Sequence, residues 1–305
     1  MSISAQNVVK FYGRQKALND VSFNINQGEI VGFLGPNGAG KSTMMKIITC
    51  YIPQSSGNVS VCGYDVREQS IEARRCIGYL PEHNPLYLDM YVREYLSFVG
   101  KVYKLKNVKQ RVEEMIDMVG LGVEAHKKIE MLSKGYRQRV GLAQAMIHDP
   151  KVLILDEPTS GLDPNQLSEI RDLIIRIGKE KTVMLSTHIM QEVEAICDRA
   201  VIITKGSIVA DSPTAELKKL TGGSTYELTV EFSGPIDAEK LRKIDGVGSV
   251  RQEGNIWYIT SSTSRDIRKE IADLATSQGL SVLTLSRKEQ KLEDIFKELT
   301  SSVTE

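Results

Sequence analysis

The chain has 305 residues, enough for one large or two medium domains, and its 39 basic residues balance its 39 acidic ones. This balance excludes the strong positive charge with which proteins hold nucleic acid or anionic membranes. The four cysteines lack paired metal spacing and no apolar run approaches the ~20 residues of a membrane span, so we expect a soluble, cytosolic protein with reduced thiols.

The first two thirds of the chain alternate strand and helix patterns. Residues 1–34 alternate polar with apolar or β-branched side chains, which favours strands, and 35–40 is a glycine-rich turn before helical spacing at 43–50. From Pro85 to Met146 the pattern is helical. Further strands are predicted at 58–62, 77–80, 152–155 and 182–187, with a helix at about 165–178. This order predicts an α/β core with a helical insert.

The last third predicts a separate small domain behind a linker at 221–225. Its pattern predicts strands at 226–232, 248–252, 255–260 and 281–285, and helices at 237–244, 264–277 and 291–299. That order favours an α+β, ferredoxin-like sandwich. Residues 223–305 hold 11 basic and 14 acidic side chains, a net charge of −3, which argues against an RNA-binding module.

The segment GPNGAGKST at 35–43 fits the phosphate-binding pattern G-x-x-x-x-G-K-[ST] between a strand and a helix. Its glycines let backbone N–H groups surround phosphate oxygens, Lys41 can reach the β- and γ-phosphates, and Ser42 can ligate Mg²⁺. The alternative is a chance glycine-rich turn, which the spacing and both flanks disfavour. The expected nucleotide contacts are Gly35, Asn37, Gly38, Gly40, Lys41, Ser42 and Thr43.

Acidic residues and a histidine follow the next two predicted strands. Asp156 ends the apolar run VLILD, where open α/β sheets bind ligands, and can hold Mg²⁺ through water. Glu157 can orient and deprotonate an attacking water, unless the pair is a structural strand-end acid pair. His188 follows TVMLST and can touch the γ-phosphate, although a lone histidine is more often a packed or surface residue.

A second anion site is predicted at LSKGYRQRV, residues 132–140. Here a serine and a glycine stand where a helix starts, with no acidic residue in the segment. Helix starts leave backbone N–H groups free and carry partial positive charge, which suits phosphate.

Together the P-loop, LSKGYRQ, LILDEP, SGLD at 160–163 and STH, in this order, resemble an ABC-type ATP-binding subunit over residues 1–220. The resemblance implies a P-loop NTPase (ABC ATPase) core at 1–221 with its helical insert at about 83–150, and a C-terminal accessory domain at 222–305. It also implies that the second anion site serves the ATP of a partner subunit. Two chains would then close head-to-tail around two ATP molecules as a homodimer.

The resemblance assigns further residues one by one. Ser133 and Gly135 would contact the partner's γ-phosphate, and Asp163 would lie at the dimer seam. Tyr12 matches the position whose ring stacks on adenine, although it can also be an ordinary core or surface aromatic. In this family Lys41, Glu157 and His188 would carry catalysis.

Two positions depart from the family pattern Leu-Ser-Gly-Gly-Gln and its glutamine loop. Lys134 and Tyr136 replace the third and fifth signature residues, while the phosphate contacts remain. Glu82 stands where the family has glutamine. It can still bind Mg²⁺ through water, but a carboxylate only accepts hydrogen bonds, whereas glutamine also donates them. The implied metal ligands are therefore Ser42, Asp156 and Glu82.

By this resemblance, the chain hydrolyses ATP with Mg²⁺ and powers a separate membrane permease, lying at the inner face of the plasma membrane. The tail resembles that of drug- and polysaccharide-type exporters, and the first half resembles gliding-motility-associated ABC subunits. We expect the apolar side chains of the insert to contact the permease, beyond those that form its own core. These are Leu86, Tyr87, Leu88, Met90, Tyr91 and Phe98.

Three other functions stay open. A soluble ABC ATPase acting on ribosomes or DNA would have two ATPase domains or long coiled coils, and neither pattern is present. The intact set of site residues argues against a non-hydrolysing regulator. A small-molecule kinase would have no use for the signature segment.

Overall fold

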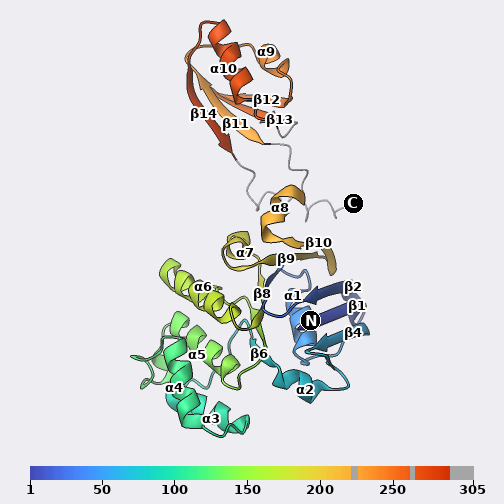
Figure 1. Ribbon diagram of the computed structural model, residues 1–305, viewed down its shortest axis with the longest axis vertical. Coiled ribbons are helices and arrows are strands. Elements are labelled where there is room, and N and C mark those ends of the chain that lie inside the picture. The colour runs from blue at the N-terminus through green and yellow to red at the C-terminus, as the bar shows by residue number, and fades with distance from the viewer. Residues whose placement is uncertain (221–225, 262–264, 289–305) are drawn as a thin grey trace. The chain divides into compact units, whose positions relative to one another are not determined.

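A computed structural model describes residues 1–220, 226–261 and 265–288. Its contacts divide the chain into two compact units, Met1–Thr214 and Ala215–Glu305 (Figure 1). The division falls seven residues before the predicted boundary at 221. The predicted linker at 221–225 and the predicted helix at 291–299 lie outside the described residues.

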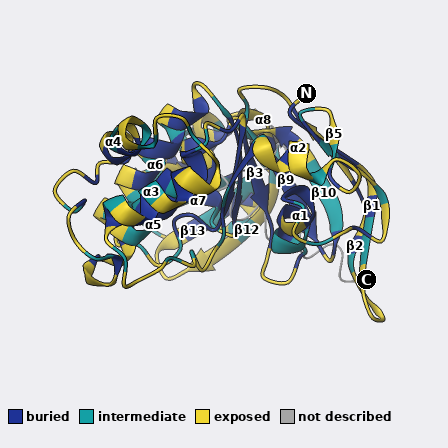
Figure 2. Cartoon of the chain, turned by 90° about the horizontal axis from the view of Figure 1, so that it is seen from below, coloured by how far each residue is buried: buried dark blue, intermediate teal, exposed yellow. Residues whose placement is uncertain are grey.

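The centre of the first unit is a six-stranded sheet in the order β10-β9-β3-β8-β7-β6. All pairs are parallel except the edge pair of β9 and β10. Every residue of β3, β7 and β8 is buried, as the continuous apolar runs predict. Figure 2 shows β3 in the dark blue of buried residues. The strands are β3 (Ile30–Leu34), β6 (Ile77–Leu80), β7 (Val152–Asp156), β8 (Thr182–Thr187), β9 (Arg199–Thr204) and β10 (Ser207–Pro213).

A second, antiparallel sheet has the order β2-β1-β4-β5. One continuous core joins it to the six-stranded sheet, and α1 contributes the fully buried Met44, Met45, Ile47 and Ile48 to that core. The elements are β1 (Ile3–Tyr12), β2 (Gln15–Ile25), β4 (Ser56–Val61), β5 (Tyr64–Asp65), α1 (Lys41–Ile48), α2 (Ser70–Arg75), α6 (Pro164–Gly178) and α7 (Met190–Ile196).

The predicted helical insert is confirmed, as three α-helices and a short 3₁₀ turn on the side of the unit away from β1, β2 and β4 (Figure 1). They are α3 (Val92–Val102), α4 (Val108–Met118), η1 (Ile129–Met131) and α5 (Lys134–Met146). The Asn84 side chain donates to the Arg137 carbonyl of α5 at 2.8 Å. It lies so close to Gly141 that a Cβ there would be 2.5 Å from Asn84 Oδ1. This contact ties the start of the insert to α5.

The second unit has an antiparallel sheet in the order β12-β13-β11-β14. Numbered within the unit and read in reverse, this order is 4-1-3-2, the arrangement of a ferredoxin-like βαββαβ fold, as predicted. Alternate residues of β11 and β13 enter a core around Trp257. The elements are α8 (Thr214–Leu220), β11 (Glu227–Phe232), α9 (Ala238–Arg242), β12 (Val247–Glu253), β13 (Ile256–Ser261), α10 (Arg268–Ser277) and β14 (Val282–Lys288).

The prediction left residues 189–220 unassigned, and the structure places α7, β9, β10 and α8 there. Within the described ranges, no helix combines the length and apolar character needed to cross a membrane. All four cysteines are free thiols, in keeping with the expectation from their spacing.

Candidate functional site

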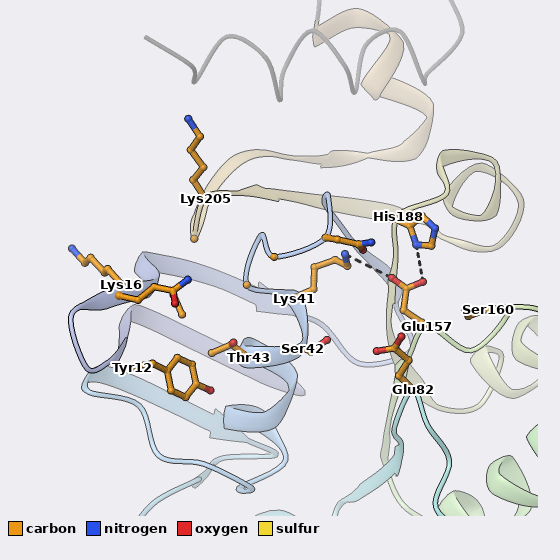
Figure 3. A pocket seen from close by; sticks show the side chains of 16 residues that line it. Tyr12, Lys16, Lys41, Ser42, Thr43, Glu82, Glu157, Ser160, His188 and Lys205 are labelled. Atoms are coloured by element: carbon orange, nitrogen blue, oxygen red, sulfur yellow. Dashed lines mark hydrogen bonds and ion pairs between the residues drawn. The ribbon is translucent and has the colours of Figure 1, made fainter.

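The strand order brings the predicted motifs together at one edge of the central sheet. Strands β3, β8 and β7 are parallel neighbours, so their carboxyl ends meet. The P-loop follows β3, His188 follows β8, and Asp156 and Glu157 stand at the end of β7. Side chains from all three loops line or border a cavity of about 860 Å³ (Figure 3).

The P-loop is shaped by its glycines. Gly38 and Gly40 have φ values of 80° and 109°, which side-chain-bearing residues rarely adopt. Helix α1 begins at Lys41 with no acidic residue in its first turn, so its free N–H groups can receive phosphate oxygens. Lys41 is buried, and its ammonium donates to the carbonyl of Gly35 at 2.7 Å. Asn37, Gly38, Gly40, Lys41, Ser42 and Thr43 all line the cavity.

Among the residues that the structure describes, only hydroxyl groups hold the Asp156 carboxylate. Its Oδ1 accepts from Ser186 Oγ at 2.6 Å and lies 3.3 Å from Ser42 Oγ, and the side chain is buried. Ser186 also accepts from the backbone N–H of Glu157 at 2.9 Å. One serine of β8 thus fixes two consecutive acidic residues at the end of β7. A carboxylate and a hydroxyl side by side are the hard oxygen donors that Mg²⁺ prefers, so these residues fit a magnesium ion.

Glu157 lies between a lysine and a histidine. Its Oε1 is 3.7 Å from Lys41 Nζ, and its Oε2 is 3.0 Å from His188 Nδ1 (Figure 3). Burial raises the pKa of the Glu157 carboxyl, against the lowering effects of His188 and Lys41. A raised pKa makes a carboxylate a better proton acceptor near neutral pH. The Glu157 backbone has a φ of 49°, an uncommon conformation for a non-glycine residue.

The rim of the cavity carries Tyr12 and Glu82, both exposed. The Lys10 ammonium lies 5.3 Å from the centre of the Tyr12 ring. Besides Ser160, which belongs to the SGLD segment but was given no role at the site, sequence reasoning missed five residues of the lining and the hydroxyl that holds Asp156. They belong to turns and strand ends without a motif, so no local pattern marked them: Gln15, Lys16, Ala17, Lys205, Gly206 and Ser186.

The residues expected to serve a partner's nucleotide stay apart from this cavity. Ser133, Gly135 and Asp163 are absent from its lining. Ser133 begins α5 and accepts from the Tyr136 N–H at 3.4 Å. Asp163 begins α6 and accepts two backbone N–H groups at 3.0 Å each. Lys134, a departure from the family pattern, is exposed beside Gly161, where an added Cβ would lie 2.2 Å from its ammonium.

Comparison with known proteins agrees with this geometry. A family model described as ABC transporter matches residues 18–160. A second family model, described as the C-terminal domain of the DrrA1-3-like ATP-binding protein, matches residues 213–300. The chain is 34% identical to the linearmycin resistance ATP-binding protein LnrL of Bacillus subtilis, covering 98% of each chain. It is 32% identical to the bacitracin transport ATP-binding protein BcrA of Bacillus licheniformis, covering 99% of this chain and 98% of BcrA.

Solved structures match the first unit. The post-hydrolysis dimer of the ATP-binding cassette MJ0796 bound to ADP and Pi aligns with a TM-score of 0.64 at 27% identity, covering 70% of this chain and 98% of that one. An ATP-binding subunit of an ABC transporter aligns with a TM-score of 0.66 at 29% identity, covering 73% and 94%. The P-loop lies beside Asp156 and Glu157, and the relatives LnrL and BcrA match this chain over nearly their whole length. The chain therefore belongs to the ABC transporter family, as one of its ATP-hydrolysing ATP-binding subunits.

Proposed function

We propose that this subunit works as an ATP-bridged homodimer with Mg²⁺ and powers a separate membrane permease that exports a small molecule. The observation that carries the catalytic part is the position of Glu157 between Lys41 and His188 at the edge of the P-loop cavity. That position suits a group that takes a proton from water attacking the γ-phosphorus.

Each side chain has a distinct part in this proposal. Lys41 would leave the Gly35 carbonyl for the β- and γ-phosphates, and its charge would offset the charge of the transferred group. Glu157 would accept the proton of the attacking water, and His188 would orient Glu157 and the γ-phosphate. Ser42 and Asp156 would hold Mg²⁺, with Glu82 reaching it through water. The ion would supply positive charge at the phosphate oxygens.

The dimer is supported by where the signature segment lies. Ser133 and Gly135 do not line the cavity of their own chain, which leaves them available to a nucleotide held by a partner. MJ0796, which aligns with this chain, is described as a dimer. In the proposed mechanism, each ATP contacts both chains in the closed dimer but only one chain in the open state. It can therefore shift the equilibrium toward closure.

The permease contact is proposed on the helical insert. Tyr87, Leu88, Tyr91 and Phe98 are exposed by 44–54%, and the Tyr87 ring lies 5.9 Å from that of Phe98. Leu86 and Met90 are half-buried and belong in part to the insert's own packing. An exposed apolar and aromatic patch of this kind suits an apolar helix of a partner. The subunit would then lie at the cytoplasmic face of the membrane through that partner.

The cargo class follows from the relatives. Besides LnrL and BcrA, the Nod factor export ATP-binding protein I of Neorhizobium galegae is 31% identical over 98% of this chain. These names favour export of a small molecule over action on a non-transport partner. A role in gliding motility is a narrower proposal, which a motility defect in a deletion strain would favour.

The first test is the mass of Glu157→Gln protein in solution with and without Mg-ATP. Removing the proposed proton acceptor should trap ATP and convert a monomer into a dimer, while hydrolysis falls to background. Glu180→Gln, an exposed glutamate outside the cavity, is the matched control and should behave as the native chain. A monomer that binds ATP but never dimerises contradicts the ATP-bridged homodimer. Undiminished hydrolysis contradicts the role of Glu157.

The permease contact has its own test. Tyr91→Ser and Phe98→Ser should keep the ATP hydrolysis of the isolated subunit and weaken its copurification with the permease. Unchanged copurification by both variants would place the contact elsewhere.

A further inference from the structure

A buried carboxylate outside the motifs lies just behind the site. Glu192, on α7, is only 1% exposed, and its two oxygens contact the hydroxyls of Thr159 and Thr187. The Thr187 contact is 2.6 Å long. Within the described ranges no cationic side chain pairs with this carboxylate.

The directions of these hydrogen bonds follow from the donors available. The hydroxyls of Thr159 and Thr187 each donate to one oxygen of Glu192. The Thr187 oxygen is then free to accept, and it receives the backbone N–H of Ile189 at 3.0 Å. Glu192 thereby fixes the turn that contains His188. A neutral amide in its place would force one hydroxyl to accept instead.

The contacts close a ring around the proposed catalytic pair. Thr159 lies two residues after Glu157, and Thr187 directly precedes His188. The side chains of Glu157 and His188 meet at 3.0 Å on the other side of the ring. Glu192 is the one member of this ring that touches both loops from behind. Its displacement would therefore change the position of His188 relative to Glu157.

Stability alone does not account for this residue. A carboxylate removed from water without a cation is costly, even when two hydroxyls satisfy it, and an apolar side chain would fill the same space without that cost. Buried polar groups that are fully satisfied can instead specify one local arrangement.

We propose that Glu192 is a positioning residue for ATP hydrolysis, which sets His188 relative to Glu157 through its contacts with Thr187 and Thr159. This rests on the proposed roles of Glu157 and His188. Glu192 itself does not line the cavity.

The test is a kinetic comparison of Glu192→Gln with Glu180→Gln, an exposed glutamate outside the cavity. For Glu192→Gln we expect kcat to fall about 10- to 100-fold, as it does when catalytic groups are slightly misplaced, with the Kd for ATP and the Tm nearly unchanged. The matched Glu180 variant should equal the native chain. A structural role would instead lower Tm and affinity along with kcat.

A double-mutant cycle identifies the route of the effect. If Glu192 acts through His188, Glu192→Gln should change the single-turnover rate less than about twofold in a His188→Ala background. The same fold-loss in both backgrounds, or a native kcat in the single variant, overturns the inference. Should the Glu192 variant fail to fold, Thr187→Val against Thr187→Ser makes the same comparison, with loss expected only for valine.

The outcome is separable from that of the proposed function. Hydrolysis that survives Glu157→Gln would refute the proposed function itself. Hydrolysis lost in Glu157→Gln but intact in Glu192→Gln would refute only the positioning role.

Discussion

Alanine in place of Gly141 should destabilise the first unit, although the same change stabilises most helices. Gly141 lies inside α5, where alanine is favoured over glycine by about 1 kcal/mol. Here the added Cβ would stand 2.5 Å from Asn84 Oδ1 and 2.6 Å from Leu80 Cδ1, far inside van der Waals contact. Asn84 must move, and its bond to the Arg137 carbonyl is lost.

The magnitude follows from three opposing contributions. The lost hydrogen bond costs about 1 kcal/mol, and forcing a methyl group into the packed site costs about 1–3 kcal/mol. Against the helix gain of about 1 kcal/mol, the net loss in unfolding free energy is about 1–3 kcal/mol. Because Asn84 follows Glu82 by two residues, ATP hydrolysis should fall as well.

The assay is denaturant unfolding followed by far-UV circular dichroism, with hydrolysis measured in parallel. Asn84→Ala provides the control: with the amide side chain gone, Gly141→Ala should destabilise less than in the native background, the remaining cost being the contact with Leu80. A Gly141→Ala protein about 1 kcal/mol more stable than the native chain would refute the reasoning, since it would show that Asn84 moves aside without cost.

Two other results are expected. Burial raises the pKa of Glu157, so ionisation of this side chain disfavours the folded state. The protonated side chain therefore contributes stability that is fully present below the ordinary pKa of 4.5 and is lost as pH rises through the pKa of the folded state. Glu157→Gln should therefore have a higher Tm than the native chain at about pH 7.5, with a difference that shrinks toward about pH 5; a lower Tm at the higher pH would contradict the direction. Tyr12→Ala should raise the KM for ATP about three- to tenfold with little change in kcat, whereas Tyr12→Phe keeps the ring and should stay near native. Equal effects of both changes would rule out stacking.

The sequence predicted the local parts of the site well. The P-loop is a contiguous segment whose glycines and lysine have one physical use, and the apolar strand before Asp156 could only be buried. Ser186 and Glu192 could not be found in this way. Their roles arise from contacts with residues 30 and 33 positions away in the chain, and neither type is unusual where it stands.

The limits elsewhere have similar causes. The elements α7, β9 and β10 are short, six or seven residues each, and lack the periodicity that reveals longer ones. Asp163 was expected at a dimer seam. The structure shows in addition that it caps the N-terminus of α6, a role typical of an aspartate that directly precedes a proline.

The order of strands also governs when the site can exist at all during synthesis. Strand β8 is inserted between β3 and β7, and its Val183 pairs with Ile30, which the ribosome adds 153 residues earlier. Until residues 182–187 have emerged, the strand bearing the P-loop and the strand bearing Asp156 have no common neighbour. Strand β7 can pair with the earlier β6, but the apolar strand β3 has neither of its sheet neighbours, β8 and β9, until residue 182 is added, and it must avoid aggregation until then. Early termination before β8 should yield an insoluble fragment, even though it carries the whole phosphate-binding motif.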